Sequence, residues 1–183
     1  MLSKNNFDEN SIIIEAFTLN HGKCTGIVYG GSSKKQKRFL QIGNKILLNW
    51  RSKNENRTGY FNVEIIDPIS PLFFDDKKRS VCILAATSIL KILLPERQGN
   101  KKIFLSFEKV LFNLKLDNWI NHYIDWELSL IKELGYENIL KVNYNNDIKK
   151  ALIFNRNLFM ENFIVPNRLK FPLYRNILES YFT

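Results

Sequence analysis

The chain has 183 residues, of which 45% are hydrophobic and 25% charged, and its formal net charge is +9. This length allows one domain or two small ones, and the composition supplies enough apolar side chains for a buried core. The longest apolar stretch, VCILAATSILKILLP, is interrupted by Lys91 and is too short and too polar to span a bilayer. The polar start MLSKNNFDENS predicts no signal peptide, so we expect a cytoplasmic protein with no membrane partner. Cys24 and Cys82 fall in apolar patterns and are expected to be reduced, buried thiols rather than a disulfide or a zinc site.

The first third of the chain predicts a small antiparallel β-barrel. Four segments are rich in apolar and β-branched residues at strand length, and they recur at intervals of about a dozen residues. They are SIIIEAFT (11–18), KCTGIVYG (23–30), KILLNWRSK (45–53) and YFNVEII (60–66). His21 and Gly22 predict a tight turn between the first two, and GGSSKKQKR (30–38) predicts a flexible basic loop between the second and the third. The hydrophilic stub MLSKNNF is a candidate for a fifth strand.

Alternation sorts the side chains of the third and fourth of these segments onto two faces, because successive residues of a strand point in opposite directions. The inward positions are Ile46, Leu48, Trp50, Phe61, Val63 and Ile65. The outward positions of the third segment are Lys45, Asn49 and Arg51, with the basic loop at the edge of the same face. A buried layer and a cationic layer are therefore expected on opposite sides of one sheet.

After the break DPISP (67–71), the pattern predicts helices, so the expected fold class is α+β. Asp75 or Asp76 is expected to cap a long, buried helix that runs to Leu94. The remaining predictions are a helix over 101–114, a helix from the cap Asp117 to Leu134 with Gly135 as its stop, a weak strand or loop around ALIF (151–154), and a last helix from Pro172 to Phe182.

Positive charge is concentrated in the predicted strand region. Residues 20–58 hold nine of the 27 basic side chains but only one of the 18 acidic ones, Glu55, so the remaining residues are close to neutral. The nine are Lys23, Lys34, Lys35, Lys37, Arg38, Lys45, Arg51, Lys53 and Arg57. An A/T-rich genome scatters lysine along a chain, but scattering would not leave the other residues nearly balanced. A polyanion, and nucleic acid above all, is the partner that this asymmetry predicts.

These side chains are expected to face solvent, because a few short strands cannot bury nine cations. Flexible lysines that line a groove follow the phosphates of a strand without reading its sequence. Tyr29, at the end of its strand, would stack a base, and a packing role is the alternative. The predicted nucleic-acid contacts are Lys23, Tyr29, Lys34, Lys35, Lys37, Arg38, Lys45, Arg51 and Lys53.

No set of catalytic residues is visible, so we expect a protein that is not an enzyme. His21 and His122 have no partner at ligand spacing, and neither a cysteine pair nor a glycine-rich phosphate loop occurs. A nuclease would need separated carboxylates that converge on a metal, and the sequence offers no such set. We therefore expect no cofactor and no metal.

One carboxylate breaks an apolar pattern. Glu127 falls on the apolar stripe of the predicted helix that ends at Leu134. A carboxylate in that position costs several kcal/mol unless it is paired. The pattern predicts an ion pair with an Arg or Lys of a neighbouring element, and a catalytic acid is the alternative.

Three stretches in order, HGKCTGIVYGGSSKKQKRFLQIGNKILLNWRSK, LLPERQ and WELSLIKELGYE, resemble the RecO family of bacterial DNA repair proteins. The resemblance covers residues 3–140 in order and spacing. It implies an OB-fold β-barrel as DNA-binding domain over 1–70 and a helical domain over 71–183, with a C-terminal subdomain from residue 140. By position, the DNA contacts that it implies are Lys23, Lys34, Lys35, Lys37, Arg38 and Arg51.

The activity that the resemblance implies is ATP-independent. A member of this family would bind single- and double-stranded DNA and anneal complementary strands in the bacterial cytoplasm, associated with the nucleoid. It would act with the partner proteins RecR and single-stranded DNA-binding protein, and it would help to load RecA.

The sequence departs from the family pattern in three places. Many members carry a four-cysteine zinc site in the region that matches NILKVNYNNDIKKALIFNRN (138–157), which has no cysteine, so no zinc is predicted. The first strand is expected to be clipped, and the last helices are expected to be shorter than in relatives.

Two rival functions stay open at this point. An RNA-binding OB-fold module, such as a translation or RNA-maturation factor, would carry the same charge pattern. A nuclease is the weaker rival, because it would need the acidic residues that the sequence does not supply.

Overall fold

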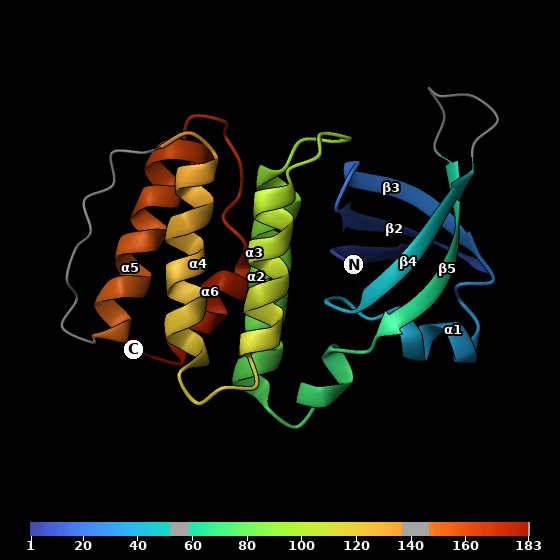
Figure 1. The fold of residues 1–183 in the computed structure, drawn as a ribbon, viewed down its shortest axis with the longest axis horizontal. Coiled ribbons are helices and arrows are strands. Elements are labelled where there is room, and N and C mark those ends of the chain that lie inside the picture. Colours follow the sequence, from blue (N-terminus) through green and yellow to red (C-terminus); the bar gives the residue numbers. More distant parts are fainter. Residues whose placement is uncertain (52–58, 137–146, 183) are drawn as a thin grey trace.

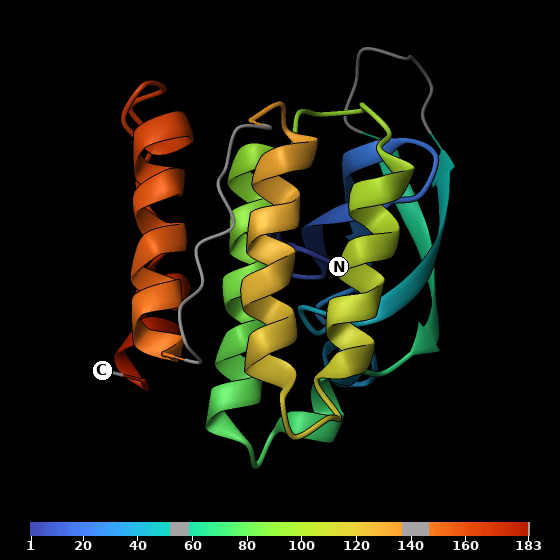
Figure 2. The ribbon, with the colours of Figure 1, turned by 60° about the vertical axis from the view of Figure 1, so that its left-hand side comes forward.

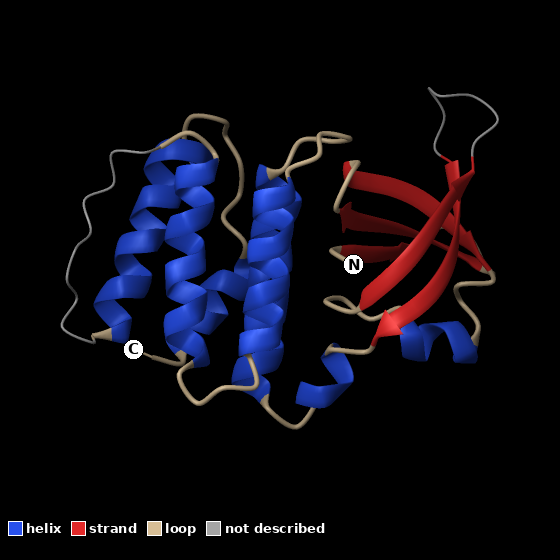
Figure 3. Ribbon diagram, in the orientation of Figure 1, coloured by secondary structure: helices blue, strands red, loops and turns tan. Residues whose placement is uncertain are grey.

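The computed structural model describes residues 1–51, 59–136 and 147–182. A five-stranded sheet occupies one side of the molecule and a bundle of helices the other (Figures 1 and 3). The strands are β1 (Ser3–Asn6), β2 (Ser11–Thr18), β3 (Gly22–Tyr29), β4 (Lys45–Arg51) and β5 (Gly59–Asp67). The hydrophilic stub therefore does form a strand, β1, which pairs with β2.

The strand order is β1-β2-β3-β5-β4. The pair β3–β5 is parallel, with Gly26 opposite Gly59, and the other pairs are antiparallel. A five-stranded, partly open barrel of this kind is an OB-fold. The predicted α+β fold with an N-terminal OB-fold is thus confirmed, and the expectation of an antiparallel barrel is corrected in one respect, because the β3–β5 pair is parallel. The described strands form an open sheet.

The open seam lies between β1 and β4. Strand β1 has only four residues, so it meets the segment before β4 rather than β4 itself. The amino group of Met1 donates to the carbonyl oxygen of Asn44 at 2.9 Å, and the N–H of Gly43 donates to the carbonyl oxygen of Met1 at 2.9 Å. Two backbone hydrogen bonds therefore join the edges where a strand ladder does not.

The predicted flexible loop is partly a helix. Residues Lys34–Phe39 form α1, and the hydroxyl of Ser33 caps it by accepting from the N–H of Gln36 at 3.3 Å. Lysine, glutamine and arginine are good helix formers, and serine is a favoured N-cap, which explains the short helix. The helix lies at the end of the sheet that is away from the bundle (Figure 1).

The inner face of the sheet has its own apolar core. Its buried members are Met1, Ile12, Ile14, Val28, Leu40 and Phe61, with Ile46, Leu48 and Val63 packed against them. This confirms four of the predicted inward positions, Ile46, Leu48, Phe61 and Val63. Ile65 is half-buried but is not among the residues of this core, and Trp50 at the end of β4 is 45% exposed. Trp50 lies beyond the core and instead has the guanidinium of Arg97 5.4 Å from its ring centroid.

The helices follow a short 3₁₀ turn, η1 (Ser70–Phe73). They are α2 (Lys77–Leu93), α3 (Lys101–Asn113), α4 (Trp119–Glu133), α5 (Ile148–Phe159) with its π-helical extension η2 (Met160–Ile164), and α6 (Leu173–Ser180). The long helix to Leu93, the helix after residue 100 and the last helix confirm the predictions. The segment ALIF lies inside α5, so the prediction of a strand or loop there is wrong.

The ends of the helices show which of the predicted capping residues form caps. Asp76 rather than Asp75 caps α2, because its carboxylate accepts from the N–H of Arg79 at 3.0 Å. Asp117 does not cap α4, whose N-cap is Asn118 without a side-chain bond. Gly135 ends α4 with a φ of 105°, a conformation that suits glycine, as predicted.

The sheet and the helices share one core. Leu2 of the N-terminal segment and Phe17 of β2 belong to the same buried cluster as α2, α3 and α4, and the rings of Phe17 and Phe104 lie 5.5 Å apart. Helices α2 and α3 stand between the sheet and α5 (Figures 1 and 2). Cys82 is buried in this core and Cys24 is partly buried, and both are free thiols. No helix within the described ranges is long and apolar enough to cross a membrane.

Candidate nucleic-acid interface

Helix α1 gathers four of the predicted contacts. Lys34, Lys35, Lys37 and Arg38 are exposed, and the first turn of the helix holds no acidic residue. Among the residues that the structure describes, none of the four forms an ion pair. The four cations repel one another on so short a helix. The phosphates of an adjacent nucleic-acid backbone would attract each of them and offset that repulsion.

The outer face of the sheet adds two aromatic rings. Tyr29 is 64% exposed at the end of β3, which argues against a packing role, and its ring centroid lies 5.8 Å from that of Tyr60 in β5. Tyr60 pairs with Arg51 across the β4–β5 ladder, and residues directly opposite each other project to the same face. Two rings and a guanidinium therefore share this face, and these are the kinds of group that proteins use to stack bases beside a cation.

Tyr60 was not predicted as a contact, although the signal was present. Phe61 points into the sheet core, so alternation sends Tyr60 outward. The next outward pair is Asn49 opposite Asn62, both exposed. Their amides extend the face with neutral groups that both donate and accept hydrogen bonds.

Lys23 lies at the boundary between the sheet and the helices instead of on the open face. Its side chain is 13% exposed, its ammonium donates to the carbonyl oxygen of Lys91 at 2.9 Å, and it lies 3.6 Å from the carboxylate of Glu96. A Cβ added to Gly22 would come within 2.1 Å of the carbonyl oxygen of Gln98. The motifs HGK and LLPERQ thus pack against each other, and Lys23 is held by the second of them.

Lys45 also faces the helices. Its ammonium lies 2.5 Å from the carboxylate of Glu108 on α3. The pairing register shifts between Lys45 and Ile46, so Lys45 does not continue the alternation of β4. The structure therefore separates Lys45 from Asn49 and Arg51, with which the sequence grouped it.

The nine predicted contacts fall into distinct places. Four lie on α1, Tyr29 and Arg51 lie on the outer face of the sheet, and Lys23 and Lys45 are paired with carboxylates that follow α2 or lie on α3. Lys53 lies outside the described residues. We define the basic face as the four cations of α1 together with Tyr29, Tyr60 and Arg51.

The two histidines of the sequence lie outside the basic face. His21 is exposed in its turn and His122 is half-buried on α4. Over residues 1–51, 59–136 and 147–182, no three His, Cys, Asp or Glu side chains are placed to hold a metal ion.

The buried carboxylate of Glu127 has the partner that its position predicted. The Nε of Arg175 donates to its Oε1 at 2.5 Å and Nη2 donates to its Oε2 at 3.1 Å. The amide of Asn155 donates to Oε2 as well, at 3.1 Å. Both ionic side chains are fully buried. Both oxygens of the carboxylate accept hydrogen bonds and neither reaches solvent. This geometry favours the predicted ion pair over the alternative of a catalytic acid.

Comparison with known proteins identifies relatives over most of the chain. The family model described as recombination protein O N terminal matches residues 1–69, and the one described as recombination protein O C terminal matches residues 75–146. The protein named DNA repair protein RecO of Roseobacter denitrificans is 33% identical over 137 residues, which are 74% of this chain and 57% of the relative.

Two further relatives carry the same name. The protein of Jannaschia sp. is 29% identical over 136 residues, which are 74% of this chain and 56% of the relative. That of Wolbachia pipientis subsp. Culex pipiens is 29% identical over 150 residues, which are 81% and 61% of the two chains. The chain therefore spans less than two thirds of the length of these curated relatives.

Proposed function

The chain belongs to the RecO family, and on that premise we propose that it is a DNA-binding mediator of repair and recombination. It binds single- and double-stranded DNA, anneals complementary strands and helps to load RecA onto DNA that the single-stranded DNA-binding protein covers. The observation that carries the proposal is the basic face, in which α1 holds four cations without carboxylate partners among the described residues, and the sheet holds the exposed ring of Tyr29 and the half-buried ring of Tyr60.

The mechanism is electrostatic and needs no nucleotide hydrolysis. Two DNA strands repel each other through their phosphates, and cations placed between them lower that repulsion. A strand would run from α1 across Tyr29 and Tyr60 toward Arg51, with its phosphates near the cations and its bases on the rings. Stacking is worth about 1–3 kcal/mol per base and tolerates any sequence, which suits annealing of arbitrary strands.

The helical part is the proposed site of partner contacts. RecR and the single-stranded DNA-binding protein would bind there, and RecA would be affected through them. This division leaves the basic face free for DNA, and it assigns no catalytic step and no cofactor to the protein. The bacterial cytoplasm, in association with the nucleoid, is the location that goes with this role.

A charge reversal on α1 tests the proposal. In the variant that replaces Lys34, Lys35, Lys37 and Arg38 with Glu, annealing of labelled complementary oligonucleotides without ATP should be lost. The matched control replaces four exposed cations of the helices, Lys77, Lys101, Lys109 and Lys149, with Glu, which changes the net charge equally. The control should keep most of the annealing rate. Unchanged annealing by the α1 variant would remove the basic face from the mechanism.

An RNA-binding module is the second candidate, since the stacking platform formed by Tyr29 and Tyr60 accepts RNA bases as readily as DNA bases. A competition experiment between single-stranded DNA and structured RNA separates the two. Preference for DNA or equal binding supports the repair role, whereas a strong preference for RNA would replace it.

A further inference from the structure

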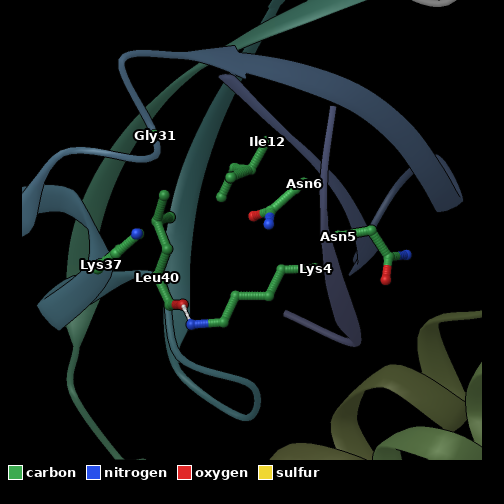
Figure 4. Close-up of a pocket in the computed structure, with 7 residues that line it drawn as sticks. All are labelled: Lys4, Asn5, Asn6, Ile12, Gly31, Lys37 and Leu40. Carbon is green, nitrogen blue, oxygen red and sulfur yellow. Dashed lines mark hydrogen bonds between the residues drawn. The ribbon is translucent and has the colours of Figure 1, made fainter. Parts of the chain in front are cut away.

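A pocket opens at the seam where the sheet is not closed. It lies between β1 and α1, and its volume is about 340 Å³ (Figure 4). Its lining residues are Lys4, Asn5, Asn6, Ile12, Gly31, Lys37 and Leu40. Ile12 and Leu40 are buried and belong to the sheet core, so the polar members of the lining face an apolar floor.

The pocket holds two ammonium groups and no carboxylate in its lining. Lys4 is anchored, because its Nζ donates to the carbonyl oxygen of Leu40 at 2.7 Å and to Oε1 of Gln41 at 3.3 Å. An ammonium has three N–H donors, so one donor of Lys4 is left for a ligand. Lys37 reaches the pocket from α1, and its side chain has no hydrogen bond or ion pair to any described residue.

The electrostatics of the pocket favour an anion. Burial and the nearby charge of Lys37 both lower the pKa of Lys4 below its ordinary value. Two like charges beside one cavity repel each other, and an anion between them would remove that repulsion. The amide of Asn6 also points into the pocket and adds a neutral donor, whereas Asn5 points away from it (Figure 4).

The position of the pocket points to the anion's source. Lys37 is at the same time a member of the exposed cation cluster on α1, so the pocket is continuous with the basic face. A strand that lies along α1 therefore passes the pocket mouth. The group of such a strand that accepts from two ammonium groups and an amide is a phosphate, which presents several acceptor oxygens at once.

We propose that this pocket is a phosphate seat, in which Lys4, Lys37 and Asn6 hold one phosphate group of the bound nucleic acid. The inference rests on the proposed function for the identity of the strand. The same chemistry serves a phosphodiester inside a strand and a monoester at its 5′ end. The seat would fix the register of the strand on α1, which a row of flexible surface lysines alone would not do.

Lysine ammonium signals recorded by ¹H–¹⁵N NMR test the seat directly. The probes are inorganic phosphate and an oligo-dT of about 12 nucleotides, a length that covers one OB-fold, with and without a 5′-phosphate. We expect the Nζ signals of Lys4 and Lys37 to shift and sharpen with at least one probe, and with inorganic phosphate even if DNA binding fails. The two oligonucleotides are then compared with each other. A shift only with the 5′-phosphorylated one identifies the terminal monoester as the ligand, and equal shifts with both identify an internal phosphodiester. If no probe moves these two signals, the proposal is overturned.

Lys37→Met is the decisive variant, because Lys37 supports no described contact and its loss should leave the fold intact. The matched control is Lys34→Met on the same helix, which removes an exposed charge outside the pocket lining. Both variants should flatten the salt dependence of single-strand binding by about 0.7 in slope, the effect of one lost phosphate contact. Only Lys37→Met should abolish the shift of the Lys4 signal with phosphate.

Two outcomes of this comparison have separate meanings. If Lys37→Met and Lys34→Met respond alike in every measurement, the pocket has no special role and the seat is overturned. If the wild-type protein does not bind DNA but its Lys4 and Lys37 signals still respond to inorganic phosphate, the seat stands and the proposed function falls.

Discussion

At the scale of single residues, the most constrained group is the guanidinium of Arg175. It heads the fully buried side chains of the described residues in volume, and it contacts Glu127, Glu179 and the carbonyl oxygen of Leu152. Burial is the largest single effect and lowers the pKa of Arg175, but Glu127, Tyr123 and Glu179 together raise it by more, so the pKa ends above its ordinary value and the charge is kept. Removing either partner would leave the charge of the other one buried and unpaired in the core.

Arg175→Met tests this pair. The variant should lose about 3–5 kcal/mol in the free energy of unfolding, because Glu127 stays buried without a cation. The double variant Glu127→Leu with Arg175→Met should recover part of that loss, since no unpaired charge remains. Urea denaturation measures both. As a control, Lys102→Met breaks the exposed pair with Glu133 and should cost less than about 1 kcal/mol. A loss for Arg175→Met no larger than for the control would mean that the pair contributes no stability.

At the scale of elements, the cap of α2 gives the clearest test, because two neighbouring acids differ in role. Partial burial raises the pKa of Asp76, but the hydrogen bonds and the charge of Arg79 outweigh burial and hold it below its ordinary value. A carboxyl group with a lowered pKa stabilises the fold above the ordinary value, and this contribution is lost as pH falls through the folded-state pKa.

Asp76→Ala should therefore lower the free energy of unfolding by about 1 kcal/mol at pH 7. The difference from wild type should shrink below the ordinary aspartate pKa of about 3.9, where the carboxylate is protonated. Asp75→Ala is the control, since Asp75 is exposed and no described residue bonds to its side chain. Chemical denaturation at several pH values measures both variants. Equal losses at the two positions would contradict the assigned cap.

The strands were predictable because alternation is a local signal, and Phe61 and Val63 point inward as their spacing requires. Helix α1 was missed because it buries no residue and so shows no apolar stripe. Helix α5 was missed for another reason. Its buried face runs through Ala151, Asn155 and Phe159, and the asparagine interrupts the apolar spacing because it bonds to Glu127.

The candidate site was only partly predictable for a related reason. Composition located the excess charge in the right segment, but the acids that pair with Lys23 and Lys45 come from distant parts of the chain. Nothing in the sequence around Glu96 or Glu108 indicates that these residues pair with Lys23 and Lys45. In the same way, the sequence required a cation for Glu127 without naming Arg175, which lies 48 residues away.

At the scale of the whole molecule, the proposed DNA contact of the basic face combines base stacking with the attraction between cations and phosphates. Only the second of these weakens as the salt concentration rises. Tyr29→Ala with Tyr60→Ala should weaken single-strand binding by about 1–3 kcal/mol for each base that loses its stack. The salt dependence of affinity should stay as in wild type, because no phosphate contact is removed. Fluorescence anisotropy at several salt concentrations measures both quantities.

Tyr174→Ala on α6 is the matched control, since Tyr174 is 41% exposed and lies outside the basic face. Affinity of the control should equal that of wild type. A double tyrosine variant that binds as tightly as the control would show that the rings pack against each other without touching bases.

The core that Leu2 and Phe17 share with the helices has a mechanical consequence. Lys23 is bound to the segment after α2, and the ammonium of Lys91 lies 3.2 Å from the carboxylate of Glu15 on β2, so charged contacts reinforce the apolar ones. The strands and the bundle should therefore tumble as one body instead of swivelling about residues 68–76. If DNA binds the basic face as proposed, a partner protein that binds the helices would therefore also fix the direction in which the DNA leaves the complex.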